Sequence, residues 1–282
     1  MSKRIHITSS GPRTGTTLLT ELFKSCFNID CSCDHEAPIS KSNSSFGKCN
    51  TVLTKKPSST DKLWTILDKI KGVYVVCVIR DPRDMIVSYH GRITDEYYCG
   101  LNFWFKFLSD YEKLKDHPRF ILIRYEDFTT NPDEIQKQIE QKIPFLKQKH
   151  KFSEYHLYAK PDDDTLKALK KLRPIESKGI GTWKKHLPRI KQQLIKYGDI
   201  TDSLRQFEYE ENPDWKKTLE NISLQEFDSY KNESIERKNS NKSVLVTLFN
   251  FWCEKIHLNP DRILKSIRSI THSTKIENVE KQ

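Results

Sequence analysis

Short apolar runs and longer amphipathic stretches alternate along the first two thirds of the chain. The runs at residues 4–8, 51–54, 73–79 and 119–125 are rich in Val, Ile and other apolar side chains, and each predicts a β-strand. The run at 73–79 is apolar at every position, which is typical of a central strand covered by helices on both faces. The pattern therefore predicts a sheet buried between two layers of helices.

Between and after these runs, apolar side chains recur at the spacing of an α-helix. Polar residues 28–50 are rich in Asp, Ser and Asn and predict mostly loop. Strands that alternate with helices form βαβ units, so we expect an α/β fold, a three-layer domain with a central, mainly parallel sheet flanked by helices. The predicted helices cover residues 16–27, 62–70, 85–90, 101–115, 132–141 and 165–172.

The character of the chain changes near residue 228. Residues 229–243 are polar and charged and predict a linker, whereas 244–269 carry an amphipathic stripe that predicts a C-terminal helical extension. We divide the chain accordingly into an α/β domain, 1–228, and a linker with that extension, 229–282. The stripe is expected to pack on the domain or on a second subunit, as in a homodimer. Its apolar part is far shorter than the roughly 20 residues of a membrane span, so no transmembrane segment is predicted.

The segment with the most chemical content is Ser-Gly-Pro-Arg-Thr-Gly-Thr-Thr at residues 10–17, between the first predicted strand and the first predicted helix. A glycine-containing loop before a helix binds phosphate through backbone N–H groups, and the helix dipole adds ~0.3–1 kcal/mol. The ATP-binding P-loop has Lys directly after its second glycine. Thr16 occupies that position here, and the cation is Arg13, upstream. The loop therefore predicts phosphate binding of a kind that differs from Mg·ATP binding.

Further candidate ligands follow other predicted strands. Arg80 ends the buried run at 73–79, and Ser88 lies eight positions later, so that a guanidinium fork and a hydroxyl can hold one phosphate. Tyr125 ends another strand. The carboxyl ends of parallel strands meet at one edge of a sheet, so we expect these residues beside the loop at 10–17. No acidic strand end completes a Mg²⁺ site, and no metal is predicted.

Four motifs in this order resemble those of the sulfotransferases. They are G-P-R-x-G-T-T at 11–17, R-D-P-R-D-x-x-V-S at 80–88, R-Y-E-D-F at 124–128 and K-G-x-G-x-W-K at 178–184. The resemblance spans about residues 4–220. It implies an enzyme that uses 3′-phosphoadenosine-5′-phosphosulfate (PAPS) and releases adenosine 3′,5′-bisphosphate (PAP). The implied reaction is an in-line, metal-independent transfer of a sulfuryl group to a hydroxyl or amine of an acceptor, with carbohydrates, lipids and small metabolites all open.

The resemblance also implies roles for single residues. The loop matches the family's 5′-phosphosulfate loop, Arg80 and Ser88 match the pair that binds the 3′-phosphate, and Tyr125 matches a tyrosine beside the adenine. The late basic loop at 178–179 matches one that closes over the 3′-phosphate. The implied donor-binding residues are Pro12, Arg13, Thr14, Gly15, Thr16, Thr17, Arg80, Ser88, Tyr125, Lys178 and Gly179.

The catalytic groups depart from the family pattern. Arg13 stands where many members carry Lys and is expected to clamp oxygens of the transferring group. Cytosolic members often carry a catalytic His in a His-Leu-Pro segment, whose nearest counterpart here is Lys55-Lys56-Pro57. Lys56, or Lys55, could hold acceptor or sulfuryl oxygens. The base is then expected to be Glu36 or His35, on the loop after the first helix.

Composition adds two expectations. The net charge of +10 suits anionic nucleotides or acidic substrates, and because zinc-finger, RRM and homeodomain patterns are absent, nucleic acid is not favoured as a partner. The seven cysteines are odd in number and lack paired CxxC motifs, which predicts free thiols in a reducing compartment. With no visible secretory signal, the expected location is cytoplasmic.

Two other functions agree with the same residues. One is a P-loop kinase that acts on a nucleotide or small molecule, although the missing Lys after Gly15 counts against it. The other is a non-catalytic, nucleotide-binding interaction protein with the same fold. Affinity for PAP over Mg·ATP, and transfer to an acceptor, would separate the three.

Overall fold

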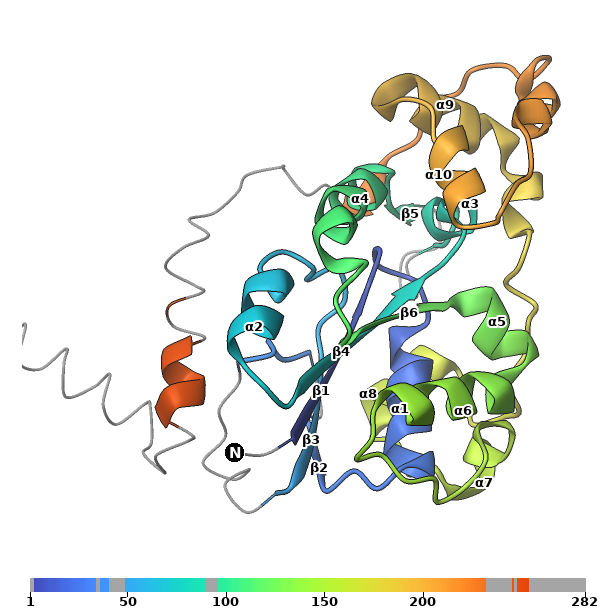
Figure 1. Cartoon of the computed structure of the whole chain (residues 1–282). Coiled ribbons are helices and arrows are strands. Elements are labelled where there is room, and N and C mark those ends of the chain that lie inside the picture. The colour runs from blue at the N-terminus through green and yellow to red at the C-terminus, as the bar shows by residue number, and fades with distance from the viewer. Residues whose placement is uncertain are drawn as a thin grey trace, which may run out of the picture.

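The computed structural model describes residues 3–33, 36–40, 49–89, 96–231, 245 and 248–253 (Figure 1). Its centre is a five-stranded sheet in which every neighbouring pair is parallel, as the alternating pattern predicts. In spatial order the strands are β2 (Cys31–Ser32), β3 (Thr51–Lys55), β1 (Lys3–Ser9), β4 (Val73–Ile79) and β6 (Phe120–Arg124). The predicted α/β class is confirmed.

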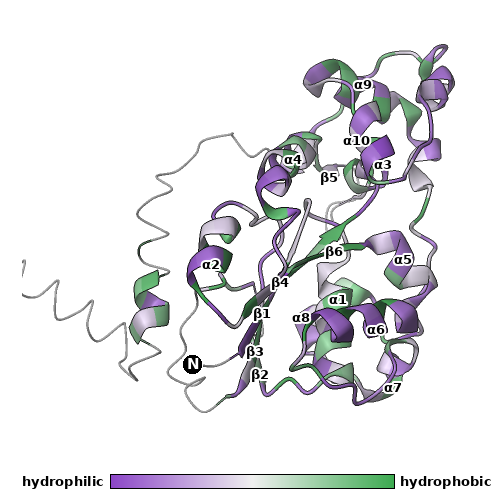
Figure 2. Ribbon diagram, viewed as in Figure 1, coloured by the Kyte–Doolittle hydropathy of each residue, from purple (hydrophilic) through white to green (hydrophobic). Residues whose placement is uncertain are grey.

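Strand β4 shows why the central run is apolar throughout. Val73, Val75, Cys77 and Ile79 belong to the hydrophobic cluster on one face of the sheet, whereas Val76 and Val78 belong to the cluster on the other. Successive side chains of a strand point to opposite faces, so a strand covered on both sides has no polar position. In Figure 2 this strand is coloured as hydrophobic at the centre of the molecule.

The two clusters are closed by different helices. Helices α1 (Thr16–Cys26), α6 (Pro132–Lys142) and α7 (Tyr155–Tyr158) cover one face, and α2 (Leu63–Lys69) and α4 (Asn102–Leu114) cover the other (Figure 1). The chain thus has the three predicted layers. Other helices are α3 (Pro82–Ile86), α5 (Tyr125–Thr130), α8 (Asp163–Leu169), α9 (Leu187–Tyr197) and α10 (Thr201–Gln206).

Helix α3 begins three residues earlier than the sequence predicts. Pro82 occupies its first turn, where a missing N–H costs nothing, and the side chain of Asp81 accepts a hydrogen bond from the N–H of Arg83 at 2.9 Å. The sequence predicts that the proline lies between the strand at 73–79 and a helix that begins at Met85. It starts the helix instead, because Asp81 caps it.

A second, small sheet joins distant parts of the chain. Strand β5 (Tyr97–Cys99) pairs in parallel with β7 (Ser229–Lys231), so the first residues of the predicted linker form a strand on the domain. Arg189, which is fully buried, donates to the carbonyl of Cys99 at 3.2 Å and to the hydroxyl of Ser229 at 2.5 Å. A buried guanidinium therefore holds the two strands together.

The C-terminal stripe is described only at residues 245 and 248–253. Phe251 is buried in the cluster that contains α2 and α4, and its ring lies 4.9 Å from the Arg4 guanidinium. Within these residues the stripe packs on the domain, as expected, whereas the homodimer and the domain division stay predictions. None of the helices in the described ranges combines the length and apolar character that crossing a bilayer requires.

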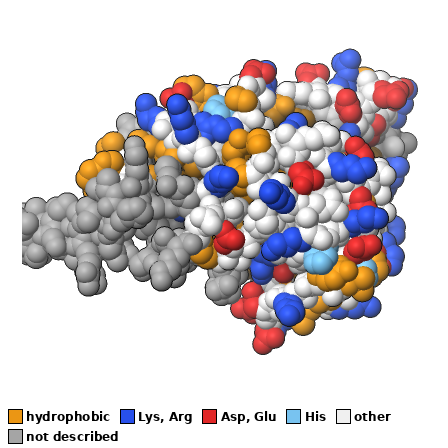
Figure 3. Space-filling view, turned by 60° about the horizontal axis from the view of Figure 1, so that its bottom comes forward, with side chains coloured by type: hydrophobic (Ala, Val, Ile, Leu, Met, Phe, Trp, Pro, Cys, Tyr) orange, Lys and Arg blue, Asp and Glu red, His pale blue; other side chains and the backbone are white. Residues whose placement is uncertain are grey.

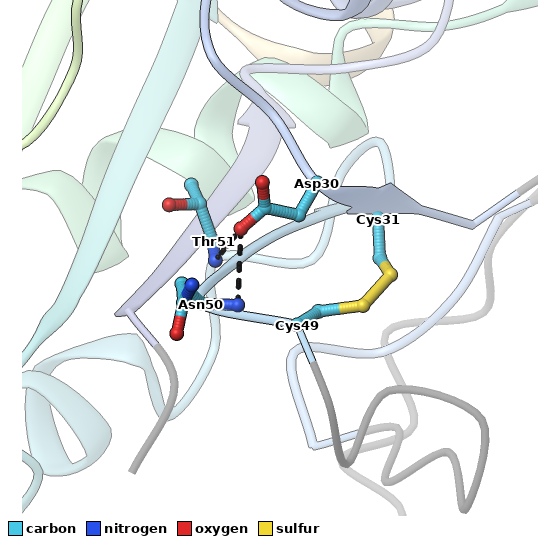
Figure 4. Close-up of a disulfide and its surroundings, with 5 residues drawn as sticks. All are labelled: Asp30, Cys31, Cys49, Asn50 and Thr51. Carbon is cyan, nitrogen blue, oxygen red and sulfur yellow. Dashed lines mark hydrogen bonds between the residues drawn. A yellow bond between two sulfur atoms is a disulfide. The ribbon is translucent and has the colours of Figure 1, made fainter.

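The expectation of free thiols is wrong for one pair of cysteines. Cys31, on β2, and Cys49, two residues before β3, form a disulfide (Figure 4). Next to it, the carboxylate of Asp30 accepts hydrogen bonds from the N–H groups of Asn50 and Thr51, at 3.0 and 2.8 Å. The edge of the sheet is thus fastened by both a covalent bond and a carboxylate. The cysteines that remain free within the described residues are all buried: Cys26, Cys33, Cys77, Cys99 and Cys253.

Candidate functional site

The loop after β1 has the backbone of a phosphate loop. Arg13 and Gly15 both have a positive φ, 65° and 86°, and the hydroxyl of Thr14 donates to the carbonyl of Gly11 at 3.0 Å. A Cβ at position 15 would lie 2.8 Å from the ring of Tyr125. Both the conformation and this contact require glycine at position 15. The ring of Tyr125 therefore packs directly on the loop.

Helix α1 begins where the loop ends and leaves its first N–H groups open to an anion. Its N-cap is Gly15, which offers no capping side chain, and its first turn holds no acidic residue. The N-terminus of an 11-residue helix without a cap is a favourable place for a phosphate. Lys55, at the end of β3, donates from Nζ to the hydroxyl of Thr17 at 3.4 Å. Lys55 thus brings a positive charge to the first turn of α1.

Arg80 is a buried cation without a counter-ion. It is 8% exposed, and its guanidinium lies 4.6 Å from the centre of the Tyr125 ring. It donates to two carbonyls, those of Arg13 at 2.8 Å and Gly179 at 2.5 Å, while its buried Nε has no partner. In the part of the chain that the structure describes, no carboxylate lies within ion-pair distance of it. Because burying an uncompensated charge is costly, this guanidinium is suited to receive an anion.

Ser88 connects Arg80's segment to the loop. Its hydroxyl accepts a hydrogen bond from Nε of Arg13 at 3.1 Å, and its carbonyl accepts one from the N–H of Tyr98 at 2.8 Å. The guanidinium of Arg13 lies 5.9 Å from the Tyr98 ring. Arg13, Arg80 and Ser88 therefore lie together, as the strand-end argument predicts.

The late loop reaches the same place through its backbone. A Cβ at Gly179 would lie 3.0 Å from Arg80 and 3.2 Å from the hydroxyl of Tyr125. The neighbouring Lys178 has an exposed side chain that pairs with Glu176 at 3.2 Å. Of the two predicted late-loop residues, Gly179 is in the site, and the Lys178 ammonium points away to Glu176.

The predicted catalytic residues do not all contact the phosphate loop. Glu36 is exposed, and the next residue, Ala37, donates to the carbonyl of Lys55 at 2.7 Å, so Glu36 lies at the carboxyl end of β3. His35 lies outside the described residues. Lys56 continues the pairing of β3 with β1 through its N–H, which donates to Ile7 at 3.0 Å, and its side chain is exposed. Lys55, not Lys56, touches the phosphate loop.

Sequence reasoning missed a buried polar cluster behind the site. The guanidinium of Arg83 lies between the rings of Trp183 and Trp215, at 4.1 and 4.9 Å, and pairs with Asp81 at 2.7 Å and with Glu210 at 2.5 Å. Burial raises the pKa of Asp81, against the lowering effect of Arg83. The signal was present in the R-D-P-R-D motif, where four charged residues stand next to a buried strand.

Surface charge outside the site is mixed. On the face in Figure 3, Lys and Arg side chains are spread over the surface, with Asp and Glu side chains between them. A cavity of about 260 Å³ opens at the outer edge of β6, between Leu122, Ile139 and Phe207, and the loop residues do not line it. Neither feature adds to the cluster around Arg80.

The comparisons with known proteins concern the fold. No family model matches the chain. No curated protein matches it either. Among solved structures, a sulfotransferase domain from the curacin biosynthetic pathway is similar at 14% identity and a TM-score of 0.49, over 76% of this chain and 99% of that chain.

Two further structures were solved with PAP. A mouse sulfotransferase complexed with PAP matches at 17% identity and a TM-score of 0.43, over 78% of this chain and 85% of that chain. A retinol dehydratase in a complex with retinol and PAP matches at 14% and 0.37, over 80% and 84%. The chain is thus structurally similar to several sulfotransferases over most of its length.

We predict that the site formed by Arg13, Arg80 and Ser88 binds inorganic phosphate through Arg80. At ten times Kd, phosphate should raise the free energy of unfolding by about 1.4 kcal/mol, and Arg80→Met should abolish that gain. The measurement is chemical unfolding with and without phosphate at constant ionic strength. As a matched control, Arg124→Met removes a nearby guanidinium that already faces Asp127 and Glu208, and should leave the gain intact. An undiminished gain in Arg80→Met would refute the site.

Proposed function

We propose that this chain is a PAPS-dependent sulfotransferase that transfers a sulfuryl group to a hydroxyl or amine of an acceptor whose identity is open. One observation carries the proposal. The buried and partly unpaired guanidinium of Arg80 lies beside, but apart from, the uncapped N-terminus of α1. Two neighbouring anion sites suit a nucleotide with phosphates at both its 3′ and 5′ positions.

The residues present fit that donor. The N–H groups at the start of α1 would hold the 5′ end, Arg80 and Ser88 the 3′-phosphate, and the half-buried ring of Tyr125 the adenine. ATP carries no 3′-phosphate and would leave Arg80 without its anion. The position after Gly15 holds Thr16 rather than the Lys that a kinase loop uses. Both points favour PAPS over ATP.

The chemistry needs positive charge and a base. The bound donor supplies an activated sulfuryl group, whose bond to the 5′-phosphate oxygen breaks as a new bond to the acceptor oxygen or nitrogen forms. Arg13 and the N–H groups of α1 would stabilise the charge that returns to the leaving phosphate. Lys55, which already contacts Thr17, would hold sulfuryl oxygens. Glu36 would accept the acceptor's proton.

Arg13 and Ser88 would also exchange partners on binding. Their mutual hydrogen bond occupies groups that the two ends of the donor need. Once Ser88 turns to a 3′-phosphate, Arg13 is released toward the 5′ side. The two anion sites are therefore expected to fill together.

The cytoplasmic location stays a prediction, and one observation weighs against it. Disulfides persist in oxidising compartments and are rare where thiols are kept reduced. The Cys31–Cys49 bond therefore favours a compartment that is not reducing.

The proposal is tested by ligand preference and turnover. PAP at 100 times Kd should raise the free energy of unfolding by about 2.7 kcal/mol, and labelled PAPS should transfer its sulfuryl group to a component of a metabolite or glycan extract. Tighter binding of Mg·ATP than of PAP would point to a kinase. PAP binding without transfer to any of a broad panel of acceptors would point to a non-catalytic protein.

Lys55 and Lys56 form a matched pair of substitutions. Lys55→Met should lower kcat by about 10²-fold, because it removes a charge near the transferring group. Lys56→Met removes an exposed charge from the adjacent position and should change kcat less than twofold. Kinetics with saturating PAPS measure both, and equal effects would remove Lys55 from the mechanism.

Glu36→Gln keeps the size and polarity of the side chain but cannot accept a proton. We expect kcat to fall by about 10²-fold or more, with the Kd of PAP unchanged. Asp30→Asn serves as a reference for altering the same loop at its anchored end. An unchanged kcat in Glu36→Gln would move the search for the base to His35.

A further inference from the structure

The late loop is attached to one short segment at two points. Arg80 donates to the carbonyl of Gly179 at 2.5 Å, and four residues later in the sequence Asp84 holds the next part of the loop. The Asp84 carboxylate is 1% exposed. It accepts hydrogen bonds from the N–H of Gly181 at 2.7 Å, the N–H of Trp183 at 2.8 Å and the hydroxyl of Thr182 at 2.9 Å.

This carboxylate has no cation of its own. Within the described residues no Lys or Arg lies within ion-pair distance of Asp84, although Arg83 pairs with both Asp81 and Glu210. Its charge is stabilised instead by three charge-assisted hydrogen bonds that N–H and O–H groups of the loop donate. The Asp84 carboxylate therefore stabilises the conformation of the loop.

On the N-terminal side of Gly181, the loop has few contacts apart from that of Gly179 with Arg80 and Tyr125. Ser177, Lys178 and Ile180 are exposed, and the pairs of Glu176 with Arg173 and Lys178 lie at the surface, where such pairs contribute little. A turn bond from the N–H of Ile180 to the carbonyl of Ser177, at 3.1 Å, fixes the direction of the chain into Gly181. The position of Gly179 on Arg80 thus depends on the anchor at Asp84.

We infer that Asp84 is a positioning residue that sets the affinity for the donor's 3′-phosphate by holding the late loop on Arg80. The inference rests on the proposed function. Asp84 does not contact the phosphate itself. It holds the loop at Gly181, Thr182 and Trp183, so that Gly179 lies against Arg80 and Tyr125, where an added Cβ would come within 3.0 and 3.2 Å of them.

The chemistry of the anchor explains why a carboxylate is needed. Both of its oxygens accept, and all three of its partners donate. Asn has the same shape but presents an NH₂ group, which would face an N–H donor on one side or the other. Asp84→Asn should therefore release one end of the loop without changing the volume of the side chain.

The experiment compares PAP with 5′-AMP, which differs only in lacking the 3′-phosphate. Calorimetry gives both Kd values for the wild type, Asp84→Asn and Thr182→Val, which removes one of the three bonds. The control is Asp110→Asn, a half-buried carboxylate on α4 that accepts from Thr60 at 2.7 Å. Unfolding of each variant without ligand records the structural cost separately.

We expect the preference for PAP over 5′-AMP to fall about tenfold or more in Asp84→Asn and less, in the same direction, in Thr182→Val. The affinity for 5′-AMP should stay within twofold. Equal losses of affinity for PAP and 5′-AMP, or an unchanged preference for PAP, would overturn the inference. If Asp84→Asn does not fold, the same comparison with Thr182→Val decides it. A wild type without preference for PAP would instead refute the two-phosphate site, and with it the proposed function.

Discussion

The arrangement of this molecule around its site depends on a single buried cation. Arg80 leaves the end of the central strand, and within the described residues its guanidinium contacts the carbonyls of Arg13 and Gly179 and the face of Tyr125, and no carboxylate. Two loops separated by more than 160 residues therefore meet on one side chain. A buried charge without a counter-ion is unfavourable by itself, so this guanidinium is suited to bind an anionic ligand.

The parallel sheet makes that meeting possible. Strands β1, β4 and β6 end at the same edge, which brings Gly15, Arg80 and Tyr125 together although each lies in a different segment. Glycine at 15 lets the backbone approach the ring of Tyr125, and glycine at 179 lets it approach the hydroxyl. Behind this layer, Arg83 between two tryptophans and Asp84 under the late loop keep the short helix α3 in place.

The sequence predicts much of this because strand ends and motifs are local signals. The four long strands, the phosphate loop and the position of Arg80 and Ser88 beside that loop all follow from runs of a few residues. Strand β2 does not, since two residues carry no periodicity, and the Cys31–Cys49 bond depends on a contact across 18 positions. Lys55 ends β3 and Lys56 continues its pairing with β1, so the two side chains point to opposite sides. Which side faces the loop is set by the register of β3 against β1. The role of Asp84 needs the late loop in three dimensions.

The fastening at the sheet edge has a consequence for how such a protein can diversify. The disulfide and the Asp30 carboxylate tie both ends of residues 32–48 to the strands that flank them. Changes of length in this interval need not displace β3, or with it Lys55, as long as Cys33 and Ala37 keep their hydrogen bonds to Leu53 and Lys55. Glu36 lies in this interval, beside the proposed place of the acceptor. Under the proposed function, one tethered segment can vary to fit different acceptors while the proposed nucleotide site stays the same.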